Sequence, residues 1–236
     1  GANHALALKN DGTVVAWGRN DARQATVPVG LTGVVALEAG ERHSLALKSD
    51  GTVVAWGAND VGQSRVPPGL RDVVAIAAGM NHSLALLDTG RVVGWGSNQF
   101  GQLNKISLPT DIVRIAAGRG TTLLLDGRGM VYPYGLTEFG IISYPKAILA
   151  PGNDIVGIDI STSNSVLMYR NGTNVIFGSP AEGIMRSRTP TSTSLVAPTA
   201  SDTALPTETW TPSFTKTLTF TRTLTPSRTP TRTRTP

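Results

Sequence analysis

Short runs of alternating apolar and polar residues, separated by glycine, proline, asparagine and aspartate, cover most of the chain. In one representative stretch these runs are His43–Leu47, Thr52–Trp56 and Val73–Ala77. Alternation and β-branched side chains favour strands, and no stretch keeps a helical period for three turns. Ser49-Asp50-Gly51, between the first two runs, has the composition of a tight hairpin turn. The pattern therefore predicts an all-β protein.

The pattern recurs with a period of 39 residues, and residues 1–39 and 40–78 are identical at 25 of 39 positions. Four units are complete, the fourth with a four-residue insertion near Ala150–Asn153, and a fifth is partial: 1–39, 40–78, 79–117, 118–160 and 161–180. The first three units share a histidine, a Trp-Gly pair and a glutamine: His4, His43 and His82; Trp17-Gly18, Trp56-Gly57 and Trp95-Gly96; Gln24, Gln63 and Gln102. Thr121 and Tyr134 replace the histidine and the tryptophan in the fourth unit.

A sheet of three short strands cannot bury its apolar faces alone, but sheets stacked radially can. A period near 40 residues with glycine and aromatic markers is typical of a β-propeller. The sequence thus predicts a propeller with blades of about 39 residues.

The stretch from Ala39 to Gln63 reads Ala-Gly-x-x-His-Ser-Leu-Ala-Leu-x-x-x-Gly-x-Val-x-x-Trp-Gly-x-Asn-x-x-Gly-Gln and resembles the regulator of chromosome condensation repeat family. The short unit and its Val66-Pro67 segment are similar to the family's bacterial branch, which includes a propeller-type β-lactamase inhibitor. The resemblance covers about residues 1–180 and implies a seven-bladed propeller. Because family members bind very different partners, it does not imply one function.

Four and a half units are too few for a seven-bladed ring. We therefore expect the chain to be a fragment that lacks two or more blades. The alternatives are an open arc and closure by self-association, since an open arc leaves strand edges that can pair with another chain.

Residues 181–236 have a different composition from the repeats. The last 51 residues contain 18 threonines and 7 prolines, with no apolar period from which to build a core. We predict a disordered, polyproline-like linker. It resembles the Thr/Pro-rich spacers of secreted or wall-attached bacterial proteins, which implies an extracellular or cell-surface location.

The formal charge of +5 comes from this tail. Residues 1–185 carry 14 basic and 14 acidic side chains, whereas the remainder carries seven basic and two acidic ones. Cations so dispersed do not favour nucleic acid as a partner. No apolar run approaches the roughly 20 residues that a membrane helix needs, so membrane insertion is not expected.

The repeated histidines do not predict a metal or catalytic site. Their spacing places one on each blade, and Thr121 and Asn164 later take the same position. A side chain that bonds the local backbone explains all of these occupants, whereas a ligand set does not. Without cysteine, a close carboxylate pair or a phosphate-binding loop, we predict no enzyme, cofactor or metal.

One repeat position holds an aromatic residue in every unit: Trp17, Trp56, Trp95, Tyr134 and Phe177. These rings either pack on the neighbouring blade or form an arc of anchors for a partner. The main hypothesis is a non-catalytic module that binds a protein of unknown identity. The alternatives are an inhibitor of a secreted hydrolase such as a β-lactamase, and guanine-nucleotide exchange on a small GTPase.

Overall fold

The computed structural model describes residues 1–104, 106–107, 109–136, 154–160 and 164–178, and the backbone of 212–213 and 219–220. The chain divides into two compact units, Gly1–Thr191 and Ser192–Pro236. Every element in the described residues is a strand, which confirms the all-β class. None of these residues forms a helix long and apolar enough to cross a membrane.

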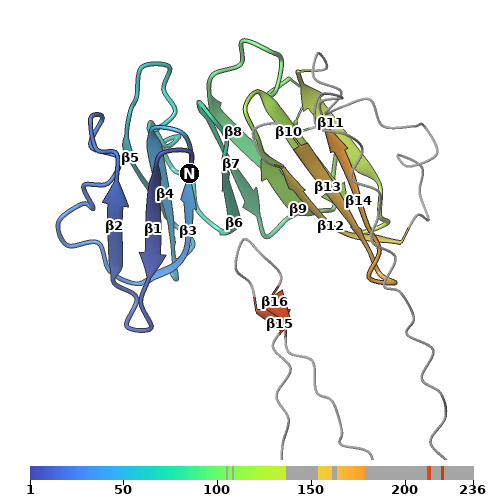
Figure 1. Cartoon of the computed structure of the whole chain (residues 1–236), viewed down its shortest axis with the longest axis horizontal. Helices are drawn as coiled ribbons and strands as arrows, with labels where there is room; N and C mark the ends of the chain where they lie inside the picture. The colour runs from blue at the N-terminus through green and yellow to red at the C-terminus, as the bar shows by residue number, and fades with distance from the viewer. Residues whose placement is uncertain are drawn as a thin grey trace, which may run out of the picture. The chain divides into compact units, whose positions relative to one another are not determined.

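Five antiparallel sheets, which we call blades 1 to 5, make up the first unit (Figure 1). Blade 1 contains β1 (His4–Leu8) and β2 (Val14–Gly18). Blades 2 to 5 hold three strands each, in chain order: β3 (Val34–Ala39), β4 (His43–Lys48) and β5 (Val53–Gly57); β6 (Val73–Ala78), β7 (His82–Leu87) and β8 (Val92–Gly96); β9 (Ile112–Ala117), β10 (Thr121–Asp126) and β11 (Val131–Gly135); β12 (Ile155–Ile160), β13 (Asn164–Tyr169) and β14 (Asn174–Gly178). In the second unit, β15 (Pro212–Ser213) pairs with β16 (Thr219–Phe220).

Each three-stranded blade takes its first strand from the end of one sequence repeat and the other two from the next. The short turn after Ala39 joins β3 to β4, and the hairpin at Gly51 joins β4 to β5, so these three strands pair. The long connection after Gly57 leads to the next blade. The predicted strands are confirmed, but Val73–Ala77 does not pair with His43–Leu47, because it begins the next blade and pairs there with β7.

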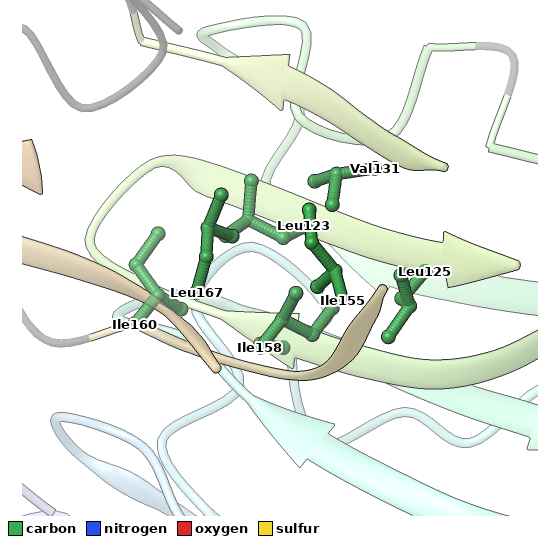
Figure 2. Packing of buried hydrophobic residues seen from close by; sticks show 8 residues of the cluster. Leu123, Leu125, Val131, Ile155, Ile158, Ile160 and Leu167 are labelled. Atoms are coloured by element: carbon green, nitrogen blue, oxygen red, sulfur yellow. The ribbon is translucent and has the colours of Figure 1, made fainter. Parts of the chain in front are cut away.

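Apolar side chains between consecutive blades form the core. Figure 2 shows this packing between blades 4 and 5, where Leu123 and Leu125 meet Ile155, Ile158 and Leu167. All five side chains are buried. Similar clusters fill the interfaces of the preceding blades, and first strands of neighbouring blades contact each other directly. Each blade is therefore stabilised by the neighbours on which it stacks.

The residue before each first strand has a left-handed backbone: Gly33, Asp72, Asp111 and Asp154, with φ of 69°, 58°, 62° and 52°. This conformation aims the Asp72 carbonyl at the hairpin of its own blade, where the amide of Asp88 donates to it at 2.9 Å. A valine follows two residues later, is left out of the strand pairing by a bulge and remains exposed: Val35, Val74, Val113 and Val156.

We expect Asp72→Val to destabilise the first unit by about 1–2 kcal/mol, because a β-branched residue tolerates the left-handed region poorly. Asp72→Gly should change stability by less than about 1 kcal/mol, since it relieves strain but adds freedom to the unfolded chain. Urea unfolding measures both changes. Arg71→Val is the matched control, because Arg71 is exposed and has no positive φ. Equal losses from Arg71→Val and Asp72→Val would contradict the backbone explanation.

Candidate functional site

The repeated histidines bond the next blade. His4 Nε2 lies 2.8 Å from Ser44 Oγ, and His43 Nε2 lies 2.9 Å from Ser83 Oγ. His82 Nε2 makes the equivalent contact with Thr122 Oγ1 at 3.1 Å. Each bond joins residues 40 positions apart and lies in the interior. The expectation that these side chains bond the local backbone is therefore wrong.

Two of these interfaces also contain one backbone carbonyl each that accepts two hydrogen bonds. Ser44 Oγ donates to the Gln24 carbonyl at 2.8 Å, and Trp56 Nε1 donates to the same oxygen at 2.9 Å. One repeat later, the Gln63 carbonyl accepts from Ser83 Oγ at 2.8 Å and from Trp95 Nε1 at 3.0 Å. The loop leaving one blade is thereby tied to the middle and last strands of the next.

These bonds fix the position of the proton on the His43 ring. The single hydroxyl hydrogen of Ser83 is used on the Gln63 carbonyl, so Ser83 Oγ must accept from His43. His43 therefore carries its hydrogen on Nε2 and is neutral. Its Nδ1 is buried and has no hydrogen-bond partner in the part of the chain that the structure describes, so a second proton there would be unsatisfied.

Glycine makes room for the buried imidazole. A Cβ on Gly40 would lie 2.5 Å from His43 Nδ1 and 2.6 Å from the Gly79 carbonyl oxygen. Burial lowers the pKa of His43 to about 3 and that of His82 to about 4. For His43 this value includes the smaller effect of the charges that His82 and His4 would carry. Both imidazole rings are therefore uncharged at neutral pH.

The structure does not bring these repeated side chains together in one cluster. Each histidine is bonded at a separate blade interface, and Gln24, Gln63 and Gln102 are equally buried. Among the described residues, no three histidine, aspartate or glutamate side chains gather as metal ligands would. The histidines form hydrogen bonds between blades, whereas the glutamine side chains form theirs within the loops.

The aromatic series is largely buried. Trp56 and Trp95 are only 8% and 7% exposed because the preceding loop covers each ring and binds its N–H. Tyr134 is half-buried against the core, and burial raises the pKa of its hydroxyl. Trp17 is 55% exposed, while Phe177 lies in β14, where only its backbone is described. An arc of five partner-binding rings is thus wrong for Trp56 and Trp95, which pack on their neighbours instead.

The loops between blades present other side chains. In each loop the buried glutamine accepts the amide hydrogen of the residue two positions earlier: Ala22 with Gln24 at 2.9 Å, Val61 with Gln63 at 3.0 Å, and Phe100 with Gln102 at 2.9 Å. Val61 and Phe100 are nevertheless 49% and 42% exposed. The glutamine hydrogen bond is therefore the same in each loop, while the residue at the loop tip varies and is exposed in the second and third loops.

A second set of bonds holds the same loops. The side-chain oxygen of Asn59 accepts the amide hydrogen of Ser64 at 3.2 Å, and that of Asn98 accepts the amide hydrogen of Leu103 at 2.8 Å. Turn bonds close both tips, from Gly62 to Asn59 and from Gly101 to Asn98. These loops are ordered by their own side chains.

Charge is concentrated on the first two loops. Arg19 donates to Asp21 at 2.7 Å, and Arg42 reaches from blade 2 to Asp21 at 3.4 Å and to Asp60 at 3.7 Å. The hydrogen bonds from Arg19 and then Gln24 lower the pKa of Asp21 to about 2. These exposed pairs orient the loops more than they stabilise the fold.

The tip residues of the loops, of which Val61 and Phe100 are exposed, were not identified individually from the sequence. Their signal was present: Ala22, Val61 and Phe100 occupy one repeat position and differ, although the glutamine two residues later is constant. The bonds from Ser44 and Ser83 were also missed. Both residues follow a histidine in the sequence, but each donates to the loop of the preceding blade, and the sequence does not show that contact.

The Regulator of chromosome condensation (RCC1) repeat model matches residues 1–24, 34–63 and 73–102. A crystal structure of Kap60 bound to yeast RCC1 (Prp20) is similar at 25% identity and a TM-score of 0.60, over 75% of this chain and 54% of that one. Prp20p from Saccharomyces cerevisiae, studied for its binding to Gsp1p and histones, is similar at 26% identity and a TM-score of 0.60, over 75% and 56%. Human WBSCR16 has the same fold at 19% identity and a TM-score of 0.61, over 75% and 59%.

The chain spans a little more than half the length of the two yeast chains. No curated protein matches it. Three repeats of this chain thus match the RCC1 repeat model, and its blades share the fold of the RCC1 propellers, so the predicted β-propeller is confirmed.

Lowering the pH from 7 to 4 should destabilise the first unit. Histidine in the unfolded chain has a pKa near 6.5, whereas folding lowers that of His82 to about 4, so protons bind the unfolded state more tightly. This contribution is complete well above pH 6.5 and is lost as the pH falls toward 4, by about 3 kcal/mol for His82. Urea unfolding at several pH values measures it. His82→Gln should have a shallower pH dependence; an unchanged dependence would contradict the assignment.

Ser83→Ala should lower the free energy of unfolding by about 2 kcal/mol, because it leaves the buried Nε2–H of His43 without an acceptor. Ser83→Thr keeps the hydroxyl, as Thr122 does in blade 4, and should cost less than about 1 kcal/mol. Urea unfolding compares the two variants. If both are equally destabilised, the side-chain volume matters rather than the hydrogen bonds.

Proposed function

Because this chain is built from regulator of chromosome condensation repeats, we propose that it is a non-catalytic module that binds another protein. The proposal rests on the loops between blades. Each is held by the same glutamine hydrogen bond, but the residue at its tip differs, and Val61 and Phe100 are exposed there. Ordered loops on a rigid scaffold are where binding residues concentrate. The partner surface is therefore the end of the propeller that bears these loops.

The yeast structures support a protein as partner. One of them contains Kap60, and the other was studied for its binding to Gsp1p and histones. Since this chain spans little more than half of either protein, their partners do not transfer to it directly. What transfers is the use of an RCC1 propeller to bind proteins.

The structural role of the repeated polar residues supports a non-catalytic module. His43 and His82 are buried and bonded between blades, and the glutamine side chains are buried within their loops, so none of these side chains is exposed at the loop end. The Thr/Pro-rich composition of residues 181–236 supports display outside a bacterial cell on a stalk. Neither nucleic acid nor membrane insertion is part of the proposal.

Two narrower functions remain as alternatives from the sequence. The first is inhibition of a secreted hydrolase such as a β-lactamase, which requires the loop end to cover an active site. The second is guanine-nucleotide exchange on a small GTPase, which requires stimulated nucleotide release. A β-lactamase activity assay and a nucleotide-release assay distinguish them from simple binding.

Titration of the full chain with three purified partners tests the proposal: a small GTPase, core histones and a β-lactamase. For the partner that binds, Val61→Asp with Phe100→Asp should weaken affinity about tenfold or more, because both tips would present charge to the interface. Calorimetry measures the affinity, and circular dichroism verifies the fold.

Val35→Asp with Val74→Asp is the matched control. These valines are 54% and 55% exposed, so the substitutions alter equally accessible side chains outside the loops. Equal weakening by both pairs, or by neither, would contradict binding at the loop end. Absence of binding to all three proteins would remove those three partners.

A further inference from the structure

The interface between blades 4 and 5 lacks the histidine that joins the earlier blades. Thr121 takes that position in blade 4, and it lies on the same face of β10 as Leu123 and Leu125, which pack on blade 5. Its hydroxyl oxygen is buried and forms no hydrogen bond with any residue that the structure describes. His43 and His82 also leave one ring nitrogen unpaired, but each bonds the next blade through the other nitrogen. The series of histidine bonds therefore ends at blade 4.

The groups that accompany each histidine are nevertheless retained at this interface. Gly79 makes room for His82, since a Cβ on this glycine would lie 2.5 Å from His82 Nδ1. Gly118 stands at the same distance in the sequence before Thr121. Ser165 takes the position of the hydroxyl residue that pairs with the imidazole of the preceding blade, and it is fully buried. A histidine in place of Thr121 would therefore have the equivalent glycine and hydroxyl groups.

The aromatic residue of blade 5 cannot make the bond that tryptophan makes in blades 2 and 3. Trp56 and Trp95 each donate their indole hydrogen to a carbonyl of the preceding loop, at 2.9 and 3.0 Å. Phe177 takes this position in blade 5, and a phenyl ring has no N–H or O–H to donate. Of the three side-chain bonds that join blades 2 and 3, the two made by histidine and tryptophan thus lack their donor residue between blades 4 and 5.

Blade 4 keeps a firmer link to blade 3. His82 Nε2 lies 3.1 Å from Thr122 Oγ1, and the backbone amide of Met80 donates to the Gly118 carbonyl at 3.0 Å. Both bonds run from blade 3 to blade 4, and each adds to the free energy needed to separate the two blades. By this measure the interface between blades 4 and 5 is the weaker of the two.

A weak interface matters because each blade is stabilised by its neighbours. Leu123 and Leu125 pack with Ile155, Ile158 and Leu167 between blades 4 and 5 (Figure 2). In a stack of repeats, stability is the sum of the repeats and of the interfaces between neighbours. An interface with fewer bonds therefore divides the stack into parts that unfold at different free energies.

We propose that the first unit has a fixed opening point between blades 4 and 5, at which blade 5 unfolds while blades 1 to 4 remain folded. Opening uncovers Leu123 and Leu125, which pack on blade 5 in the closed stack. The loops that carry Val61 and Phe100 precede blade 4 in the chain and keep their glutamine bonds. The proposal is therefore independent of partner binding at those loops.

Hydrogen–deuterium exchange of the full chain, resolved by mass spectrometry of peptic fragments, tests this proposal. The amides of β12–β14 should exchange about tenfold or more faster than those of β9–β11, because opening between blades 4 and 5 exposes only the former. Equal protection of the two blades would overturn the proposal. The last described blade could also fray without a specific weak interface, so variants that add or remove the histidine bond are compared.

Thr121→His places an imidazole opposite Ser165 and should slow the exchange of β12–β14 about tenfold, the effect of one added buried hydrogen bond. Thr121→Leu is the matched control, because its side chain is also larger than threonine but cannot bond Ser165; it should slow this exchange by less than about threefold. His82→Thr creates the same defect one interface earlier. It should accelerate the exchange of β9–β11 about tenfold, because blades 4 and 5 then open together.

Slower exchange of β12–β14 in Thr121→His, together with faster exchange of β9–β11 in His82→Thr, supports the proposal. Exchange of β12–β14 that Thr121→His leaves unchanged, or that Thr121→Leu slows equally, overturns the assignment of the opening point to the missing histidine bond. If Thr121→His does not fold, His82→Thr decides the question, and unchanged exchange of β9–β11 in that variant overturns the proposal.

Discussion

One backbone carbonyl at each of two consecutive blade interfaces holds the repeats in register. The carbonyls of Gln24 and Gln63 each accept a hydroxyl and an indole N–H from the following blade, and the hydroxyl itself accepts from a histidine. All of these atoms are buried, so each must have its partner if the interface is to form without an unsatisfied group. This requirement explains why histidine, serine or threonine, and tryptophan recur together, while the glutamine recurs because its side chain holds the loop that presents the carbonyl.

The requirement also divides the residues of a repeat into two kinds. Those that bond across the interface are fixed in type, and Gly40 and Gly79 are fixed with them because the imidazole occupies the space of a Cβ. The loop tips take part through their backbone amides alone, so Ala22, Val61 and Phe100 can differ. Surface chemistry can therefore change from loop to loop while the interfaces between blades stay the same.

Much of the fold could be predicted from the sequence, since identity between repeats and alternation within them reveal the strands and their period. The bonds between blades could not, because a 39-residue period shows that His43 and Ser83 recur without showing that they meet. Which rings of the aromatic series are buried could not be predicted from the sequence either. Trp56 is buried by the loop that precedes it, and only the stacking of blades reveals this cover.

The candidate site shows the same limit. A constant glutamine beside a varying residue was visible in the sequence, but not that the glutamine is buried and the variable residue exposed. Sequence periodicity locates equivalent positions, whereas their contacts depend on the neighbouring blade.

The bonds between blades also have a consequence for how the chain folds. They join residues separated by 20, 32 or 40 positions, so none reaches beyond the adjacent repeat. For a β-sheet protein this makes the contacts unusually local, and the loss of chain entropy on forming each interface is small. Blades can therefore assemble one after another as the polypeptide emerges from the ribosome, each completed blade serving as the template for the next.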